Sequence, residues 1–140
     1  MGLLLRLLVA AGLAADAYAH WRFAPDMKFV EGGSIDGDVL FRAQAIVAAL
    51  AGLLVLVLAN RVTYAIAFVV AASAVGALLL YYYVDVGALG PLPDMYDHGW
   101  YGEKTISLVG EGIAALAALA GFFTVRTGTR RDAADHASRT

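Results

Sequence analysis

Three ionisable side chains interrupt long apolar stretches of the sequence, and they are its clearest candidates for chemistry. Asp16, Arg42 and Glu111 each lie within a run of mostly apolar residues. An ionised side chain in hydrocarbon costs about 2.5–3.5 kcal/mol on insertion scales, so such a residue usually has a paired structural role or a function. The three residues therefore predict a polar cluster inside a membrane-embedded bundle of helices.

Other polar residues share helix faces with these charges. His20 follows Asp16 by four residues, and residues at that spacing are neighbours on a helix surface. Lys104 and Ser107 precede Glu111 at similar spacing, so the three form one polar stripe. With a rise of about 1.5 Å per residue, all of these side chains reach the same half of the bundle. The predicted cluster comprises Asp16, His20, Arg42, Gln44, Lys104, Ser107 and Glu111.

The cluster permits two kinds of interpretation. In the first, it is a structural ion-pair network in which the guanidinium fork of Arg42 binds Glu111 or Asp16 and thereby fixes the rotation of the helices. In the second, it is a site for an organic ligand, a lipid head group, a proton or a metal ion. Histidine and carboxylates suit zinc, iron or copper, and the candidate ligands are His20, Asp16, Glu111 and His98. A nearby Arg42 would oppose a bound cation, and these residues have no ligand-spacing signature.

The sequence carries none of the common catalytic signatures. It has no nucleophile elbow, no Walker loop, no HExxH motif and no glycine-rich dinucleotide turn. It also has no cysteine, which excludes disulfides, thiol redox chemistry, thiolate metal sites and iron–sulfur clusters. These features favour a non-enzymatic protein, and no cofactor can be named from the sequence.

The composition and the apolar stretches predict a membrane protein. The chain is 61% hydrophobic and 16% charged, whereas about 25% of the residues in soluble domains are charged. Four stretches of about the ~20 residues that span a bilayer cover approximately residues 2–18, 39–59, 62–84 and 105–125. Each must be helical, because lipid offers the backbone no other hydrogen-bond partners. We expect an all-α, four-helix transmembrane bundle over residues 1–125 and a cytoplasmic polar tail at 126–140.

The distribution of basic residues predicts the orientation of this bundle. One end carries Arg6, Arg61, Arg126, Arg130 and Arg131, whereas the other carries Arg22, Lys28 and Lys104 among many acids. The positive-inside rule then places both termini in the cytoplasm and the two longer loops, around residues 21–38 and 85–104, outside. The prediction is a multi-pass protein of the bacterial inner membrane.

The first apolar stretch has a second interpretation as a signal peptide. Residues 17–19 (AYA) have the pattern of a signal-peptidase site. Cleavage there would leave His20 at the N-terminus, where its amine and ring could bind copper. Residues 1–5 contain no basic side chain, and Asp16 interrupts the apolar run, so an uncleaved helix is favoured.

Several short motifs extend over the chain up to about residue 125. They are AYAH at 17–20, GDVLFRAQA at 37–45, YVDVG at 83–87, GPLPD at 90–94 and EKT at 103–105, followed by Glu111. Through them the chain resembles a group of small four-helix membrane proteins of actinobacteria and, more distantly, DoxX-like proteins. The resemblance implies a fold and a membrane location but no reaction. It also implies His20, Lys104 and Glu111 as site positions.

These observations lead to two functional hypotheses. The first is a non-enzymatic scaffold, accessory component or small-ligand binder with the polar cluster in its outer half. The alternative is a membrane enzyme or proton-coupled transport component that uses Glu111 with Asp16 and His20, with or without a metal. The expected partner is the lipid bilayer, and a membrane-protein partner or a second copy stays open. Net charge −2 argues against nucleic acid.

Overall fold

The computed structural model describes residues 2–125, which form four long helices and one short 3-10 helix. The elements are α1 (Gly2–Phe23), η1 (Asp26–Phe29), α2 (Gly37–Val57), α3 (Arg61–Tyr83) and α4 (Gly102–Thr124). Each of the four α-helices is long and apolar enough to cross a membrane, which confirms the predicted all-α, four-helix architecture. The predicted tail at 126–140 lies outside the described residues.

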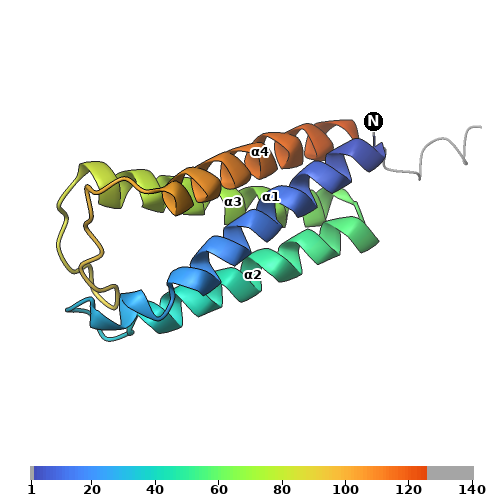
Figure 1. Cartoon of the computed structure of the whole chain (residues 1–140). Helices are drawn as coiled ribbons and strands as arrows, with labels where there is room; N and C mark the ends of the chain where they lie inside the picture. The colour runs from blue at the N-terminus through green and yellow to red at the C-terminus, as the bar shows by residue number, and fades with distance from the viewer. Residues whose placement is uncertain (1, 126–140) are drawn as a thin grey trace, which may run out of the picture.

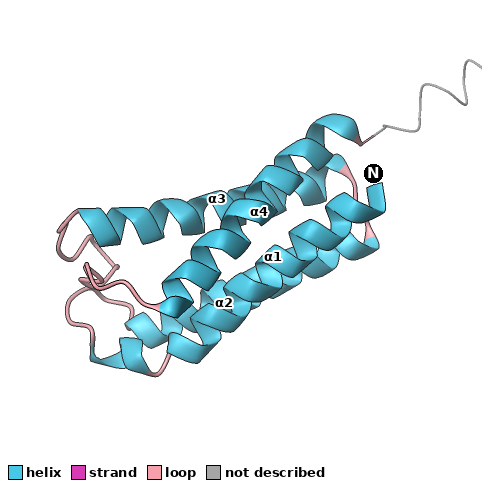
Figure 2. Cartoon of the chain, turned by 45° about the horizontal axis from the view of Figure 1, so that its top comes forward, coloured by secondary structure: helices cyan, strands magenta, loops and turns pink. Residues whose placement is uncertain are grey.

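The four α-helices run lengthwise along one another (Figure 1). Helix α1 packs against both α2 and α4, and α3 packs chiefly against α4. Both long loops lie at one end of the bundle, called here the loop end, and the α2–α3 turn lies at the other, the hairpin end. Towards the loop end, α3 diverges from α1 and α2 (Figure 2). The bundle is therefore tighter at its hairpin end.

Small residues allow the close approach of α1 and α4. A Cβ atom added to Gly110 of α4 would lie 2.9 Å from the carbonyl oxygen of Gly12 in α1, so neither position has room for a side chain. The buried alanines Ala48, Ala67 and Ala114 line the neighbouring interfaces. Close packing of small residues is how helices associate in lipid, where the hydrophobic effect gives no driving force between them.

Large apolar side chains cover the outside of the bundle instead of its interior. Exposed examples are Leu3, Leu53, Val57, Val69, Leu116 and Phe123. A soluble protein seldom exposes so continuous an apolar surface, because its contact with water is unfavourable. The four apolar helices therefore indicate contact with a lipid bilayer.

The hairpin end is closed by local hydrogen bonds. The side chain of Asn60 accepts a hydrogen bond of 2.9 Å from the Thr63 N–H, and the Thr63 hydroxyl accepts one of 3.0 Å from the Asn60 N–H. This capping box satisfies two donors at the start of α3. Arg61 then donates from Nε to the carbonyl of Phe122 in α4 at 3.2 Å, which ties the turn to the last helix.

The loop end is closed by contacts between two segments that are distant in sequence. The N–H groups of Ser34 and Ile35 both donate to the carbonyl of Pro91, at 3.1 and 3.0 Å. The N–H of Asp94 donates to the carbonyl of Glu31 at 2.8 Å. The loop before α2 and the loop before α4 therefore form one cover over the diverging helices.

The helix bounds differ from the predicted ones mainly at the loop end. Helix α1 continues to Phe23, beyond the predicted end near residue 18, and α4 already begins at Gly102. Residues 17–19 thus lie inside a continuous helix, and Ala19 is buried. Polar and aromatic residues at these helix ends lowered the local hydropathy, so the apolar pattern stopped short of the true ends.

Candidate functional site

A cavity of about 390 Å³ lies between the helices at the loop end. Its walls are mostly apolar and aromatic, with Phe23 from α1, Phe41 from α2 and Leu78 from α3. Polar side chains from all four helices also line it, among them His20, Gln44, Ser73, Lys104, Ser107 and Glu111. The cavity lies where α3 diverges from α1 and α2. The loop before α4 contributes Leu92 and Met95, and η1, in the connection before α2, contributes Met27.

Two carboxyl groups and an imidazole meet beside this cavity. Asp16 and His20 come from α1 and Glu111 from α4, and one ligand atom from each lies within 4.8 Å of the others. Asp16 lies one turn after Gly12, and Glu111 directly follows Gly110. The close α1–α4 packing therefore brings the carboxyl groups together. Both acids are 0% exposed.

Each carboxyl group of this cluster is held through one of its two oxygens. Gln44 donates from Nε2 to Asp16 Oδ2 at 3.0 Å, and the Ser107 hydroxyl donates to Glu111 Oε1 at 2.5 Å. Within residues 2–125, the other oxygens, Asp16 Oδ1 and Glu111 Oε2, have no hydrogen-bond partner. The sequence-predicted residues Gln44 and Ser107 thus orient the two acids.

His20 contacts Asp16 in two ways. Its Nδ1 donates to the backbone carbonyl of Asp16 at 3.0 Å, and it lies 2.6 Å from Asp16 Oδ1. Only the contact with the carbonyl has the angle of a hydrogen bond, so the contact with Oδ1 is an ion pair when the imidazole is protonated. The ring also packs against that of Phe41, with centroids 4.8 Å apart.

The predicted pairing of Arg42 with Glu111 or Asp16 is wrong. Arg42 donates from a terminal nitrogen to Asp38 Oδ2 at 2.7 Å, and its side chain is 43% exposed. Asp38 lies four residues earlier on the same helix, where a local ion pair forms without crossing the bundle. The exposed guanidinium thereby remains at the boundary of the apolar region. The structural network proposed for Arg42 does not form.

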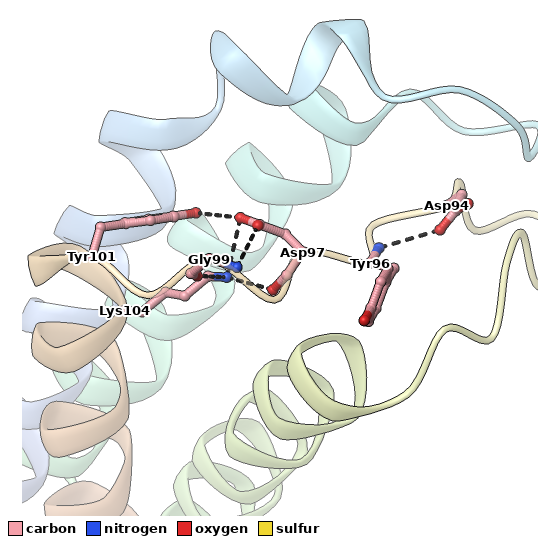
Figure 3. Close-up of polar contacts among 6 residues, drawn as sticks. All are labelled: Asp94, Tyr96, Asp97, Gly99, Tyr101 and Lys104. Atoms are coloured by element: carbon pink, nitrogen blue, oxygen red, sulfur yellow. Dashed lines mark hydrogen bonds and ion pairs between the residues drawn. The ribbon is translucent and has the colours of Figure 1, made fainter.

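Lys104 is likewise engaged outside the buried cluster (Figure 3). Its ammonium group donates to the carbonyls of Asp97 and Gly99, at 2.7 and 2.6 Å, and lies 3.1 Å from Asp97 Oδ2. It also lies 4.8 Å from the ring centroid of Tyr101. The predicted polar stripe is therefore divided: Ser107 and Glu111 belong to the cluster, and Lys104 fixes the loop before α4.

The contacts around Asp97 shift two pKa values in this loop. Burial alone would raise the pKa of Asp97, but hydrogen bonds from the Gly99 N–H and from Lys104, with the lysine's charge, lower it below its usual value. Burial and the charge of Asp97 raise the pKa of Tyr101 to about 12. Tyr101 also donates from its hydroxyl to Asp97 Oδ2 at 3.3 Å. The Asp97 carboxyl therefore carries a negative charge at neutral pH.

The fourth metal candidate, His98, lies away from the cluster. It is exposed, and its ring packs against Tyr96 with centroids 5.7 Å apart. Three of the four predicted candidates, Asp16, His20 and Glu111, do come together. We find one site residue that the sequence analysis missed: the Tyr81 hydroxyl is buried beside the cavity without a partner among the described residues. Its place within three consecutive tyrosines, typical of a membrane interface, hid this role.

Comparison with known proteins finds no matching protein family, no matching curated protein and no matching solved structure. The resemblance to actinobacterial and DoxX-like membrane proteins stays a prediction.

Proposed function

We propose that the chain is a multi-pass membrane protein that binds a small amphipathic molecule in the cavity at its loop end. The observation that carries this proposal is a cavity with mostly apolar walls whose lining includes Glu111 and Tyr81. Within residues 2–125, Glu111 Oε2 and the Tyr81 hydroxyl are buried and have no hydrogen-bond partner. Binding sites for small molecules are typically concave and apolar, with a few polar groups that fix orientation. The volume of about 390 Å³ lies within the usual range for such sites.

The chemistry of the lining restricts the ligand. The rings of Phe23, Phe41 and Tyr82 offer contact to an apolar body, and Gln44, Ser107 and Glu111 offer polar contacts. Because Glu111 Oε2 has no hydrogen-bond partner within residues 2–125, a ligand group that donates a hydrogen bond to it fits best.

The same geometry argues against a purely structural role for the buried acids. The ion pair that would have made them structural does not form, because Arg42 binds Asp38. Buried carboxyl oxygens that accept no hydrogen bond destabilise a fold, so a protein with no use for them would be expected to lack them. The alternative of proton-coupled transport through Glu111 would use the same residues and stays a prediction.

The distribution of charge supports an outward-facing cavity. The hairpin end carries Arg6 and Arg61, and the sequence adds the basic residues after position 125. The loop end carries most of the acids. The positive-inside rule then favours both termini in the cytoplasm of a bacterial cell and a cavity that opens on the outer side of the inner membrane.

Native mass spectrometry of gently solubilised protein tests the proposal. We expect the wild-type chain to carry an organic mass, and we expect Ala77→Phe, which places a ring in the cavity, to lose it. The matched control is Ala120→Phe, which adds the same ring at an exposed position of α4 near the hairpin end. A wild-type chain without bound mass, or with only a stoichiometric protein partner, would overturn the proposal.

A further inference from the structure

Two fully buried acids lie side by side in the bundle, and the basic group beside them is the imidazole of His20. Neither Asp16 nor Glu111 contacts a lysine or arginine in the part of the chain that the structure describes. Arg42 is held by Asp38, and Lys104 is held by the loop around Asp97. Like charges in a medium of low polarity repel strongly, so a positive charge between the two carboxylates would stabilise the pair.

We infer that Asp16, His20 and Glu111 bind a divalent transition-metal ion, which supplies that charge. The three ligand atoms lie within 4.8 Å of one another, close enough to converge on one ion after small side-chain movements. Asp16 and His20 are separated by one helical turn, and Glu111 faces them from the neighbouring helix. Metal sites in helical bundles are built in this way from inward-pointing side chains on facing helices.

The neighbouring residues are arranged as they are around a metal site. Gln44 holds Asp16 through Oδ2 and Ser107 holds Glu111 through Oε1, so each carboxyl group keeps one oxygen without a hydrogen bond. Outer hydrogen bonds that orient the ligands are a general property of metal sites. Within residues 2–125, Asp16 Oδ1, which lies 2.6 Å from His20 Nδ1, and Glu111 Oε2 accept no hydrogen bond, although both side chains are 0% exposed. This observation is independent of the residue types.

The donor set indicates the class of metal. One imidazole nitrogen and two carboxylate oxygens suit Zn²⁺, Mn²⁺ or Fe²⁺, whereas a site without sulfur disfavours Cu⁺. Two carboxylates balance the charge of a divalent ion. Three protein ligands leave a coordination position open, and because His20 and Glu111 line the cavity, that position faces it. This inference goes beyond the proposed function, since the ion can bind whether or not the cavity holds an organic molecule.

Titration of chelator-stripped, detergent-solubilised protein with Zn²⁺ by calorimetry tests the inference. We expect one Zn²⁺ per wild-type chain and at least about tenfold weaker binding by Glu111→Gln and His20→Gln, each of which removes a ligand. The control His98→Gln, which changes an exposed histidine outside the cluster, should bind as the wild type does. Wild-type protein that is helical but binds no Zn²⁺, or Glu111→Gln that binds it unchanged, would overturn the inference.

A thermal-shift measurement guards against variants that fold poorly. Zn²⁺ should raise the Tm of the wild type and of His98→Gln but not that of Glu111→Gln, because only a ligand bound to the folded state stabilises it. An equal rise in the Tm of all three proteins would overturn the inference.

The metal site and the proposed cavity ligand can be disproved separately. An organic mass without Zn²⁺ binding overturns only the metal site, and Zn²⁺ binding with no organic mass overturns only the proposed cavity ligand.

Discussion

The two ends of the bundle are built from different residues and have different properties. At the hairpin end, small residues and a buried aromatic ring fill the interior: a Cβ on Gly121 would lie within 2.6 Å of ring carbons of Tyr64. At the loop end, α3 diverges, a cavity remains, and acids with unsatisfied oxygens are buried beside it. Close packing provides stability, whereas the loop end keeps polar groups that packing alone does not explain. This difference agrees with the proposal that the hairpin end stabilises the bundle and that the loop end binds a ligand.

The largest expected change in stability comes from a substitution that disrupts the packing of the hairpin end. Gly121→Leu should destabilise the protein by about 2–3 kcal/mol, because the new side chain must displace the buried ring of Tyr64. Unfolding by denaturing detergent, followed by circular dichroism, measures this change. The control is Gly76→Leu in α3, since a Cβ there meets nothing within 4 Å. Equal losses of stability in both variants would show that the close contact between Gly121 and Tyr64 is not the cause of the destabilisation.

At the loop end we expect a substitution to raise the stability of the protein, by a smaller amount. In the presence of a chelator, Glu111→Gln should stabilise the protein by about 1–3 kcal/mol, because it removes an uncompensated buried charge. With saturating Zn²⁺ the wild type should become the more stable of the two. Arg42→Leu is the comparison: its partly exposed pair with Asp38 should contribute about 0.5 kcal/mol, and its effect should add to that of Glu111→Gln. A strong coupling between the two changes would instead indicate that Arg42 does reach Glu111.

The smallest expected effect concerns the cover of the loop end. The lowered pKa of Asp97 means that its contacts with Lys104 stabilise the loop above the ordinary pKa of about 3.8. That contribution is lost as the pH falls through the folded-state pKa below that value. We expect the fluorescence of Trp100 in this loop to change below about pH 4 in the wild type. The change should be absent in Asp97→Asn and present in the control Glu103→Gln. A Trp100 signal that is independent of Asp97 would contradict this account.

The sequence predicted the helices and three members of the cluster for physical reasons. Membrane helices need long apolar runs, which any hydropathy pattern reveals. Asp16 and His20 fall on one helix face because of their spacing, so their proximity follows from helix geometry alone. Glu111 stands out because no other acid lies in its apolar run. These properties depend on residues that are close together in the sequence, so they can be recognised without a structure.

The remaining features depend on contacts across the bundle. Arg42 was assigned to the wrong partner although Asp38, four residues away, offered a local one. The cavity depends on the divergence of α3, and this divergence accompanies backbone contacts such as those between Ser34, Ile35 and Pro91. Backbone hydrogen bonds between distant loops require no particular side chain, so they leave no pattern in the sequence.

The placement of the two acids on the first and last helices affects how the protein is made. A ribosome completes α1 well before α4, so Asp16 exists for a period without Glu111. During that time the Asp16 carboxyl can contact His20 of α1 and Gln44 of α2, but not Glu111. A metal ion or shared proton between the acids can be held only after α4 has packed along α1. Occupancy of the proposed site would therefore report that the first and last helices have packed together.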